Sequence, residues 1–142
     1  MTLEQIRLVQ ESYRKILPVK EITAERFYAR LFQLDPSLRA LFKSDMKEQG
    51  KKFVDMMDLV VGGLNKFEED VVPIVRELGA RHSTYGVKPQ HYQVLKQALL
   101  GALEEVLADD FAAETRQAWA ATYDLLAQAM IELPSAPADA SS

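Results

Sequence analysis

One histidine lies where the pattern of the sequence calls for an apolar side chain. His82 follows Ile74 and Leu78, and precedes Tyr85, at the spacing of a single helix face. An imidazole on such a face is either a buried core histidine with a hydrogen-bond partner or a ligand to a group held inside the fold. The pattern alone leaves both interpretations open.

Several kinds of chemistry lack the residues that they need. His82 and His91, the only two histidines, lie on either side of a Gly and Pro corner, and the chain has no Cys and no HExxH motif, which argues against zinc. Ser83 adjoins His82, but consecutive helix positions do not face each other, which argues against a Ser-His-Asp relay. No glycine-rich phosphate loop is present.

A lone neutral imidazole in an apolar helical pocket suits the axial ligation of haem iron. The porphyrin is a large flat apolar disc with two charged propionates. It therefore needs a slot lined by apolar side chains, one ligand to the iron and a cation at the rim. Because the chain has no Cys, a thioether attachment is excluded, and the cofactor expected is haem b.

The elements that would position these residues are helices. Thr2 with Gln5 forms a capping box, Asp35 with Pro36 can begin a short helix, and Asp45 begins a long one. The predicted helices carry the apolar positions Leu3 to Ile16, Phe27 to Phe32, Leu38 to Phe42, Phe53 to Leu64, Ile74 to Tyr85, Tyr92 to Val106 and Phe111 to Met130. We expect one all-α domain of seven to eight helices over residues 1–133, with a disordered polar tail over 134–142.

Composition narrows the classes of partner. A formal net charge of -4 and a pI near 5.2 argue against nucleic acid, which favours basic proteins. No run of about 18 apolar residues occurs, so no membrane span is predicted. The first residues, MTLEQIRLVQ, lack the apolar core of a signal peptide, and the expected location is cytoplasmic.

Four segments together resemble the bacterial single-domain globins, meaning the bacterial haemoglobins and the haem domain of the flavohaemoglobins. They are ERFYARLFQLDPSLRALF, EQGKKF, LGARHSTYGVKPQHY and AWAATY, in this order. The resemblance covers roughly Leu3 to Glu132. It implies the globin fold, a haem pocket enclosed by the helices, and the binding of diatomic gases at the iron.

The same resemblance implies a role for each residue on the proximal side of the haem. His82 is the proximal ligand and the metal-binding residue, and its other ring nitrogen donates to the carbonyl of Leu78. Leu78, Val87, Tyr92 and Leu95 line the proximal half of the slot. Phe42 stacks on the haem face; the alternative is that Phe42 is an ordinary core residue.

On the opposite side, the resemblance places Tyr28, Gln49 and Phe53 above the iron. Lys52 pairs with a propionate. Three alternatives remain for these polar residues. The Tyr28 hydroxyl reaches a carbonyl, Gln49 turns to water, and Lys52 is an ordinary solvated lysine.

Three functions are compatible with this site. The first is reversible binding of dioxygen and other diatomic gases. The second is nitric oxide dioxygenation, for which we expect an external reductase, since 142 residues leave no room for flavin and nicotinamide domains. The third is a gas sensor that acts through a partner. The sequence does not decide whether the protein is an enzyme.

Overall fold

The computed structural model describes residues 1–42, 45–77, 88 and 90–141, and it describes side chains as far as residue 130. These residues are almost entirely helical and include no strand. The all-α class predicted from the sequence is confirmed. No helix among the described residues is long and apolar enough to cross a membrane.

Five long α-helices account for most of the described chain. They are α1 (Leu3–Ile16), α2 (Lys20–Leu34), α3 (Met46–Gly62), α5 (His91–Leu107) and α6 (Ala113–Ser141). Shorter 3₁₀ helices are η1 (Leu17–Val19), η2 (Pro36–Leu41), η3 (Leu64–Lys66) and η5 (Ala108–Asp110), and a π-helix, η4, spans Phe67–Val71. The bounds of α6 include positions 134–141, and a domain boundary at 133 with a disordered tail stays a prediction.

Local sequence signals fix several helix starts. Thr2 and Gln5 make both hydrogen bonds of the capping box that begins α1, at 3.1 and 3.0 Å. Asp35 accepts from the Ser37 main-chain N–H at 3.1 Å and begins η2. Asp45 precedes α3 as predicted, although its side chain makes no capping hydrogen bond.

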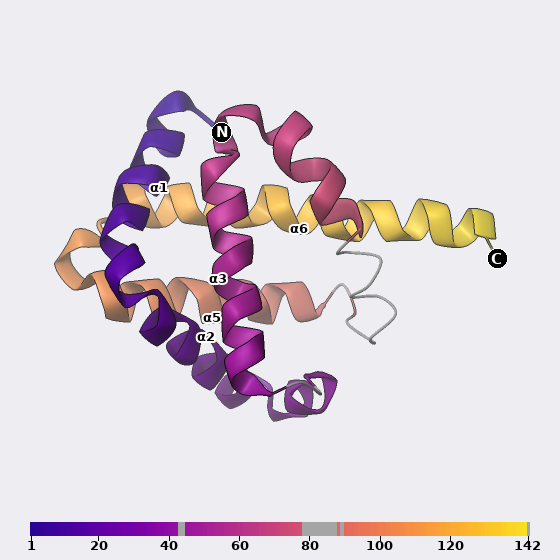
Figure 1. Cartoon of the computed structure of the whole chain (residues 1–142), viewed down its shortest axis with the longest axis horizontal. Helices are drawn as coiled ribbons and strands as arrows, with labels where there is room; N and C mark the ends of the chain where they lie inside the picture. Colours follow the sequence, from indigo (N-terminus) through magenta and orange to yellow (C-terminus); the bar gives the residue numbers. More distant parts are fainter. Residues whose placement is uncertain (43–44, 78–87, 89, 142) are drawn as a thin grey trace.

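The helices pack as crossed pairs (Figure 1). α2 packs on α5 and on α3, α1 packs on α6, and in this view α3 passes across α5 and α6. The larger core cluster joins α1, α3, α5 and α6, and includes Ile16, Leu103 and Trp119. A second cluster joins α2 to η2 and α5. The site described below lies where these two clusters meet, at Phe53 and Leu95.

Two adjacent glycines at the end of α3 differ in their surroundings. A Cβ atom on Gly63 would lie 2.6 Å from Cγ2 of Val71, which is fully buried, and 3.1 Å from the carbonyl oxygen of Leu59. A Cβ atom on Gly62 would meet nothing within 4 Å. Gly63 has a φ of -100°, so the backbone itself would accept alanine. Contact with Val71 is therefore what demands glycine at 63.

Replacement of these glycines gives a matched test of the packing at the end of α3. Gly63→Ala is expected to lower the free energy of unfolding by about 1–3 kcal/mol, because Val71 must move. Gly62→Ala is expected to raise it by up to about 1 kcal/mol, because alanine favours the helix. Urea denaturation of both variants measures the difference. Equal effects of the two substitutions would contradict the close approach of Val71.

Candidate functional site

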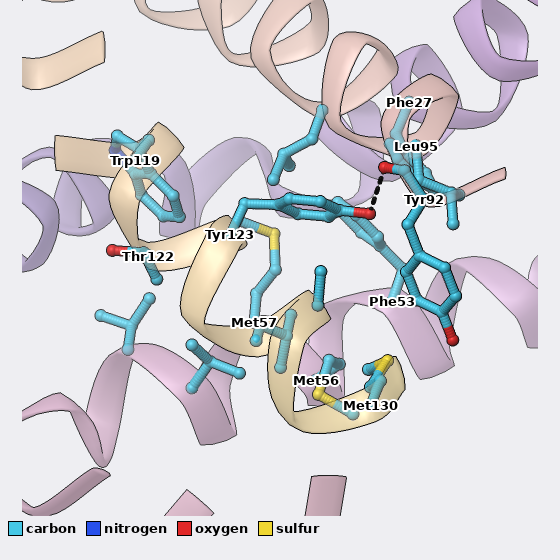
Figure 2. Close-up of a pocket in the computed structure, with 15 residues that line it drawn as sticks. Phe27, Phe53, Met56, Met57, Tyr92, Leu95, Trp119, Thr122, Tyr123 and Met130 are labelled. Atoms are coloured by element: carbon cyan, nitrogen blue, oxygen red, sulfur yellow. Dashed lines mark hydrogen bonds between the residues drawn. The ribbon is translucent and has the colours of Figure 1, made fainter. Parts of the chain in front are cut away.

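A cavity of about 130 Å³ lies between α3, α5 and α6 (Figure 2). Its volume is close to that of an engineered apolar cavity of roughly 150 Å³ that binds benzene. The lining residues are Phe27, Phe53, Met56, Met57, Val60, Val61, Tyr92, Leu95, Leu99, Trp119, Thr122, Tyr123, Leu126, Ala127 and Met130. Almost all of these side chains are apolar or aromatic. The cavity therefore suits a flat apolar group better than a polar substrate.

Three polar side chains in the cavity wall make hydrogen bonds to the protein itself. The Tyr123 hydroxyl donates to the main-chain carbonyl of Tyr92 at 2.6 Å, and this bond is drawn in Figure 2. Trp119 Nε1 donates to Ser12 Oγ at 2.8 Å, and Thr122 Oγ1 donates to the Ala118 carbonyl at 2.9 Å. Burial raises the pKa of Tyr92 to about 12, so its phenol is neutral near pH 7. The wall thus carries no charge at these positions.

An aromatic group adjoins the cavity and surrounds Tyr28. The Tyr28 ring makes edge contacts with Phe27, Phe42 and Phe53, at centroid distances of 4.9, 5.4 and 6.2 Å. Phe53 also stacks on Phe27 at 4.5 Å, and both line the cavity. Three residues predicted for the site, Tyr28, Phe42 and Phe53, are therefore brought together.

The Tyr28 hydroxyl donates to the main-chain carbonyl of Gln49 at 3.2 Å. Tyr28 is buried, and burial raises the pKa of its phenol well above the usual range. This contact is the alternative arrangement named in the sequence analysis, in which the hydroxyl reaches a carbonyl. The bond also fixes the first turn of α3 against α2. A role for this hydroxyl toward a bound gas stays a prediction.

The other predicted residues differ in where they lie. Gln49 is half-buried and Lys52 is exposed on α3. Tyr92 and Leu95, from α5, line the cavity directly. His82, Leu78 and Val87 lie outside the described residues, so their predicted roles stay predictions.

The second histidine has a structural role at the start of α5. His91 Nδ1 accepts a hydrogen bond from the main-chain N–H of Lys88 at 3.0 Å, which closes the turn before the helix. Among the described residues, no cluster of three or more His, Cys, Asp or Glu side chains could hold a metal ion.

Sequence reasoning treated much of the cavity wall only as helix core. Met56, Met57 and Met130 belong to this wall, as do Trp119 and Tyr123. Their helical spacing predicted burial, but periodicity cannot separate a filled core from a cavity wall. The two methionines in the apolar stripe of α3 are the signal that could have indicated the cavity, because methionine adapts its shape to irregular spaces.

A family model described as Globin matches residues 25–130 of the 142. The chain is a globin. An uncharacterized globin-like protein of Aquifex aeolicus is 35% identical to this globin over 113 residues, which cover 80% of this chain and 78% of the relative. The family predicted from the four sequence segments is therefore confirmed.

Flavohemoproteins are further relatives of this globin. The one from Bacillus subtilis is 29% identical over 113 residues, which cover 78% of this chain but 28% of the relative. The one from Vibrio cholerae is 24% identical over 134 residues, which cover 93% of this chain and 34% of the relative. This globin thus spans about a third of the length of these relatives.

Solved structures show the same fold. A bacterial globin from Campylobacter jejuni superposes with a TM-score of 0.85 at 23% identity, and the match covers 97% of this globin and 99% of that chain. A hexacoordinated heme protein from a tardigrade also has a TM-score of 0.85, at 16% identity. At these identities the likeness shows the fold alone, and it confirms the globin fold predicted from the sequence.

The hydrogen bond from Trp119 to Ser12 gives a test of the cavity wall. Ser12→Ala leaves the indole N–H buried without its acceptor, and we expect this to cost about 1–3 kcal/mol of unfolding free energy. A double-mutant cycle with Trp119→Phe isolates the bond, because phenylalanine has no N–H to satisfy. If Ser12→Ala costs as much in the Trp119→Phe background, the bond does not stabilise the wall.

Proposed function

We propose that this globin binds haem b at the cavity between α3, α5 and α6, which would take up part of the porphyrin, and that it reversibly binds dioxygen and other diatomic gases at the haem iron. The observation that carries the proposal is the apolar wall of this cavity, which lies in a globin fold beside the aromatic group around Tyr28. Haem supplies the iron centre that binds the gas. The chain has no Cys, so packing and an axial ligand would hold the group.

His82 is the residue that we assign as axial ligand. The chain has two histidines, and His91 is already engaged through Nδ1 in closing the turn before α5. His82 is then the imidazole left for the iron. The neutral imidazole is the form that binds a metal.

Tyr28 and Gln49 are the polar side chains that we assign to the bound gas. The Tyr28 hydroxyl donates a hydrogen bond to the Gln49 carbonyl. A rotation of the hydroxyl away from this carbonyl would let the hydroxyl donate to another acceptor. The aromatic contacts with Phe27 and Phe42 would keep the ring in place during that rotation. A bound gas with partial negative charge would compete with the carbonyl for the hydroxyl proton.

A second function, nitric oxide dioxygenation, is favoured by the flavohemoprotein relatives. For this second function we propose an external reductase as the source of the electrons that the iron would need. Stopped-flow mixing of the oxygenated protein with nitric oxide, followed by addition of a reductase, separates the two functions. If nitric oxide oxidises the iron and no reductase reduces it again, the proposed function is reversible gas binding and not dioxygenation. A gas sensor remains a third proposal, and it would require a partner that responds to ligation.

The assignment of His82 predicts a spectroscopic difference between the two histidines. After haem is supplied, His82→Ala is expected to lose most of the intense Soret absorbance and to regain it when imidazole is added. His91→Ala is expected to keep the absorbance, because its ring serves the turn before α5. If the wild-type protein shows no Soret band after haem is supplied, the proposed function is wrong. If both variants keep the band, the assignment of His82 is wrong.

The assignment of Tyr28 predicts a kinetic effect. Tyr28→Phe removes a donor worth about 1.5–3 kcal/mol to a charged partner, so dioxygen dissociation should be about 10- to 100-fold faster. Stopped-flow displacement of dioxygen by carbon monoxide measures the rate. Gln49→Leu keeps the main-chain carbonyl that Tyr28 contacts, so this variant reports on the side-chain amide alone. An unchanged rate of dioxygen dissociation in Tyr28→Phe would show that the Tyr28 hydroxyl keeps its hydrogen bond to the Gln49 carbonyl and does not donate to the gas.

A further inference from the structure

A row of oxidisable aromatic side chains leads from the cavity to the surface of the protein. We propose that Trp119 and Tyr13 form a one-electron relay that carries oxidising equivalents out of the cavity, with Asp58 as the proton acceptor at its outer end. The physiological oxidant in this proposal rests on the proposed haem site. The relay itself depends only on side chains that the structure describes.

The inner end of the relay is in the cavity wall. Trp119, the only tryptophan of the chain, lines the cavity and is 3% exposed. Tyr123 lines the same cavity and follows Trp119 by four residues on α6, so the two side chains are neighbours on one face of the helix. Figure 2 shows both rings on the same wall. An oxidant in the cavity would therefore reach an indole before it reached the surface.

The outer end of the relay is on α1 and α3. The Tyr13 ring lies 6.3 Å from the Trp119 ring between centroids, tilted by 55°. The Tyr13 hydroxyl donates to the Asp58 carboxylate, and Asp58 is exposed to solvent. Tyr13 is thus the step between a buried indole and a carboxylate in water.

Hydrogen bonding at the indole favours onward transfer. Trp119 Nε1 donates to a serine hydroxyl, Ser12 Oγ, and this hydroxyl is itself within donating distance of the carbonyls of Leu8 and Val9, at 2.7 and 3.0 Å. A hydroxyl is a weak base, so an oxidised indole would keep its N–H proton and remain a strong oxidant. The charge would then pass to the nearest side chain that can release a proton.

Tyr13 can release that proton. Before oxidation its phenol is neutral, because burial and the negative charge of Asp58 raise its pKa well above the usual range. Loss of an electron makes a phenol strongly acidic, and the carboxylate already accepts its hydrogen bond. In the relay step one electron moves from Tyr13 to the Trp119 cation radical, and one proton moves from the Tyr13 hydroxyl to Asp58. The products are neutral Trp119, a neutral Tyr13 phenoxyl radical and a neutral Asp58 carboxylic acid.

The oxidant that we assign to this relay is hydrogen peroxide, and bound haem would supply the centre that reduces it. Each peroxide molecule takes up two electrons and two protons and becomes two molecules of water. Two passages through the relay supply the two electrons. Small one-electron donors in solution, such as ascorbate or phenols, then return them to Tyr13 beside the exposed Asp58. The relay would give this globin a peroxidase activity whose reductants need not enter the cavity.

The relay can be tested without any oxidant in the cavity. A nanosecond ultraviolet pulse photoionises tryptophan, and Trp119 is the only tryptophan among the 142 residues. The expected result is that the tryptophan radical decays as a tyrosyl radical rises at the same rate, and that this rise disappears in Tyr13→Phe. A tryptophan radical that persists in the wild-type protein, or a tyrosyl signal that survives in Tyr13→Phe, overturns the proposal. Circular dichroism checks that each variant is folded.

Two carboxylates on α3 provide a matched pair for the proton step. Asp58→Asn removes the acceptor of the Tyr13 proton, and the transfer should slow by about tenfold or more, since a charge-assisted hydrogen bond is lost. Asp55→Asn removes a nearby charge that also acts on Tyr13 but accepts no hydrogen bond from it, and the rate should change little. Equal rates in Asp58→Asn and the wild type would overturn the role of Asp58.

A second experiment uses the haem-loaded protein with hydrogen peroxide and a nitroso spin trap. Mass spectrometry should find the adduct on Tyr13, and Trp119→Phe should greatly reduce it. If Trp119→Phe leaves the amount of Tyr13 adduct unchanged, electrons do not pass through Trp119, and the proposed route from the cavity is wrong. If no electron passes from Tyr13 to Trp119 after photoionisation, the relay is wrong, whether or not the protein binds haem. If the electron passes but the protein binds no haem, the relay stands and only the proposed function is wrong.

Discussion

The structure depends on one constraint: a cavity inside a small helical protein must have a wall whose polar atoms are satisfied by the protein itself. An unsatisfied donor or acceptor in such a wall costs about 1–3 kcal/mol. This globin meets the constraint by turning the polar ends of Trp119, Thr122 and Tyr123 into the surrounding structure. The rings then present apolar surface to the cavity, which would disfavour water and favour a porphyrin.

The same bonds hold the helices around the cavity. The bond from Trp119 to Ser12 joins α6 to α1, and the bond from Tyr123 to the Tyr92 carbonyl joins α6 to α5. On the other side, the bond from Tyr28 to the Gln49 carbonyl joins α2 to α3. The proposed site and the proposed relay are therefore built from the contacts that position the helices. A change in any of these side chains should affect stability and chemistry together.

Sequence reasoning succeeded where the signal is local. The capping box of Thr2 and Gln5 and the start of η2 at Asp35 depend on residues within a few positions of each other, and both occur as predicted. The apolar stripe from Phe53 to Leu64 predicted α3 for the same reason, although the α-helix ends at Gly62 and Leu64 begins η3. The globin fold followed from the order of four segments, since no single segment is specific enough.

The remaining features depend on contacts between distant parts of the chain. Ser12 and Trp119 are 107 residues apart, and no pattern in either helix announces their hydrogen bond. The acceptor of the Tyr28 hydroxyl is a main-chain carbonyl, which every residue possesses, so the residue types could not indicate it. The hydrogen bond from Tyr13 of α1 to Asp58 of α3 likewise joins residues that are far apart in the sequence. Tertiary packing decides such pairs.

The central claim is that His82 binds haem iron, and a resonance Raman spectrum of the ferrous protein tests it most directly. Protein grown with histidine that carries heavy nitrogen should show the iron–nitrogen stretching band at a lower frequency than unlabelled protein, and the His91→Ala variant should show the same shift. A band that does not move with the label, or a shift that disappears in His91→Ala, would contradict the claim.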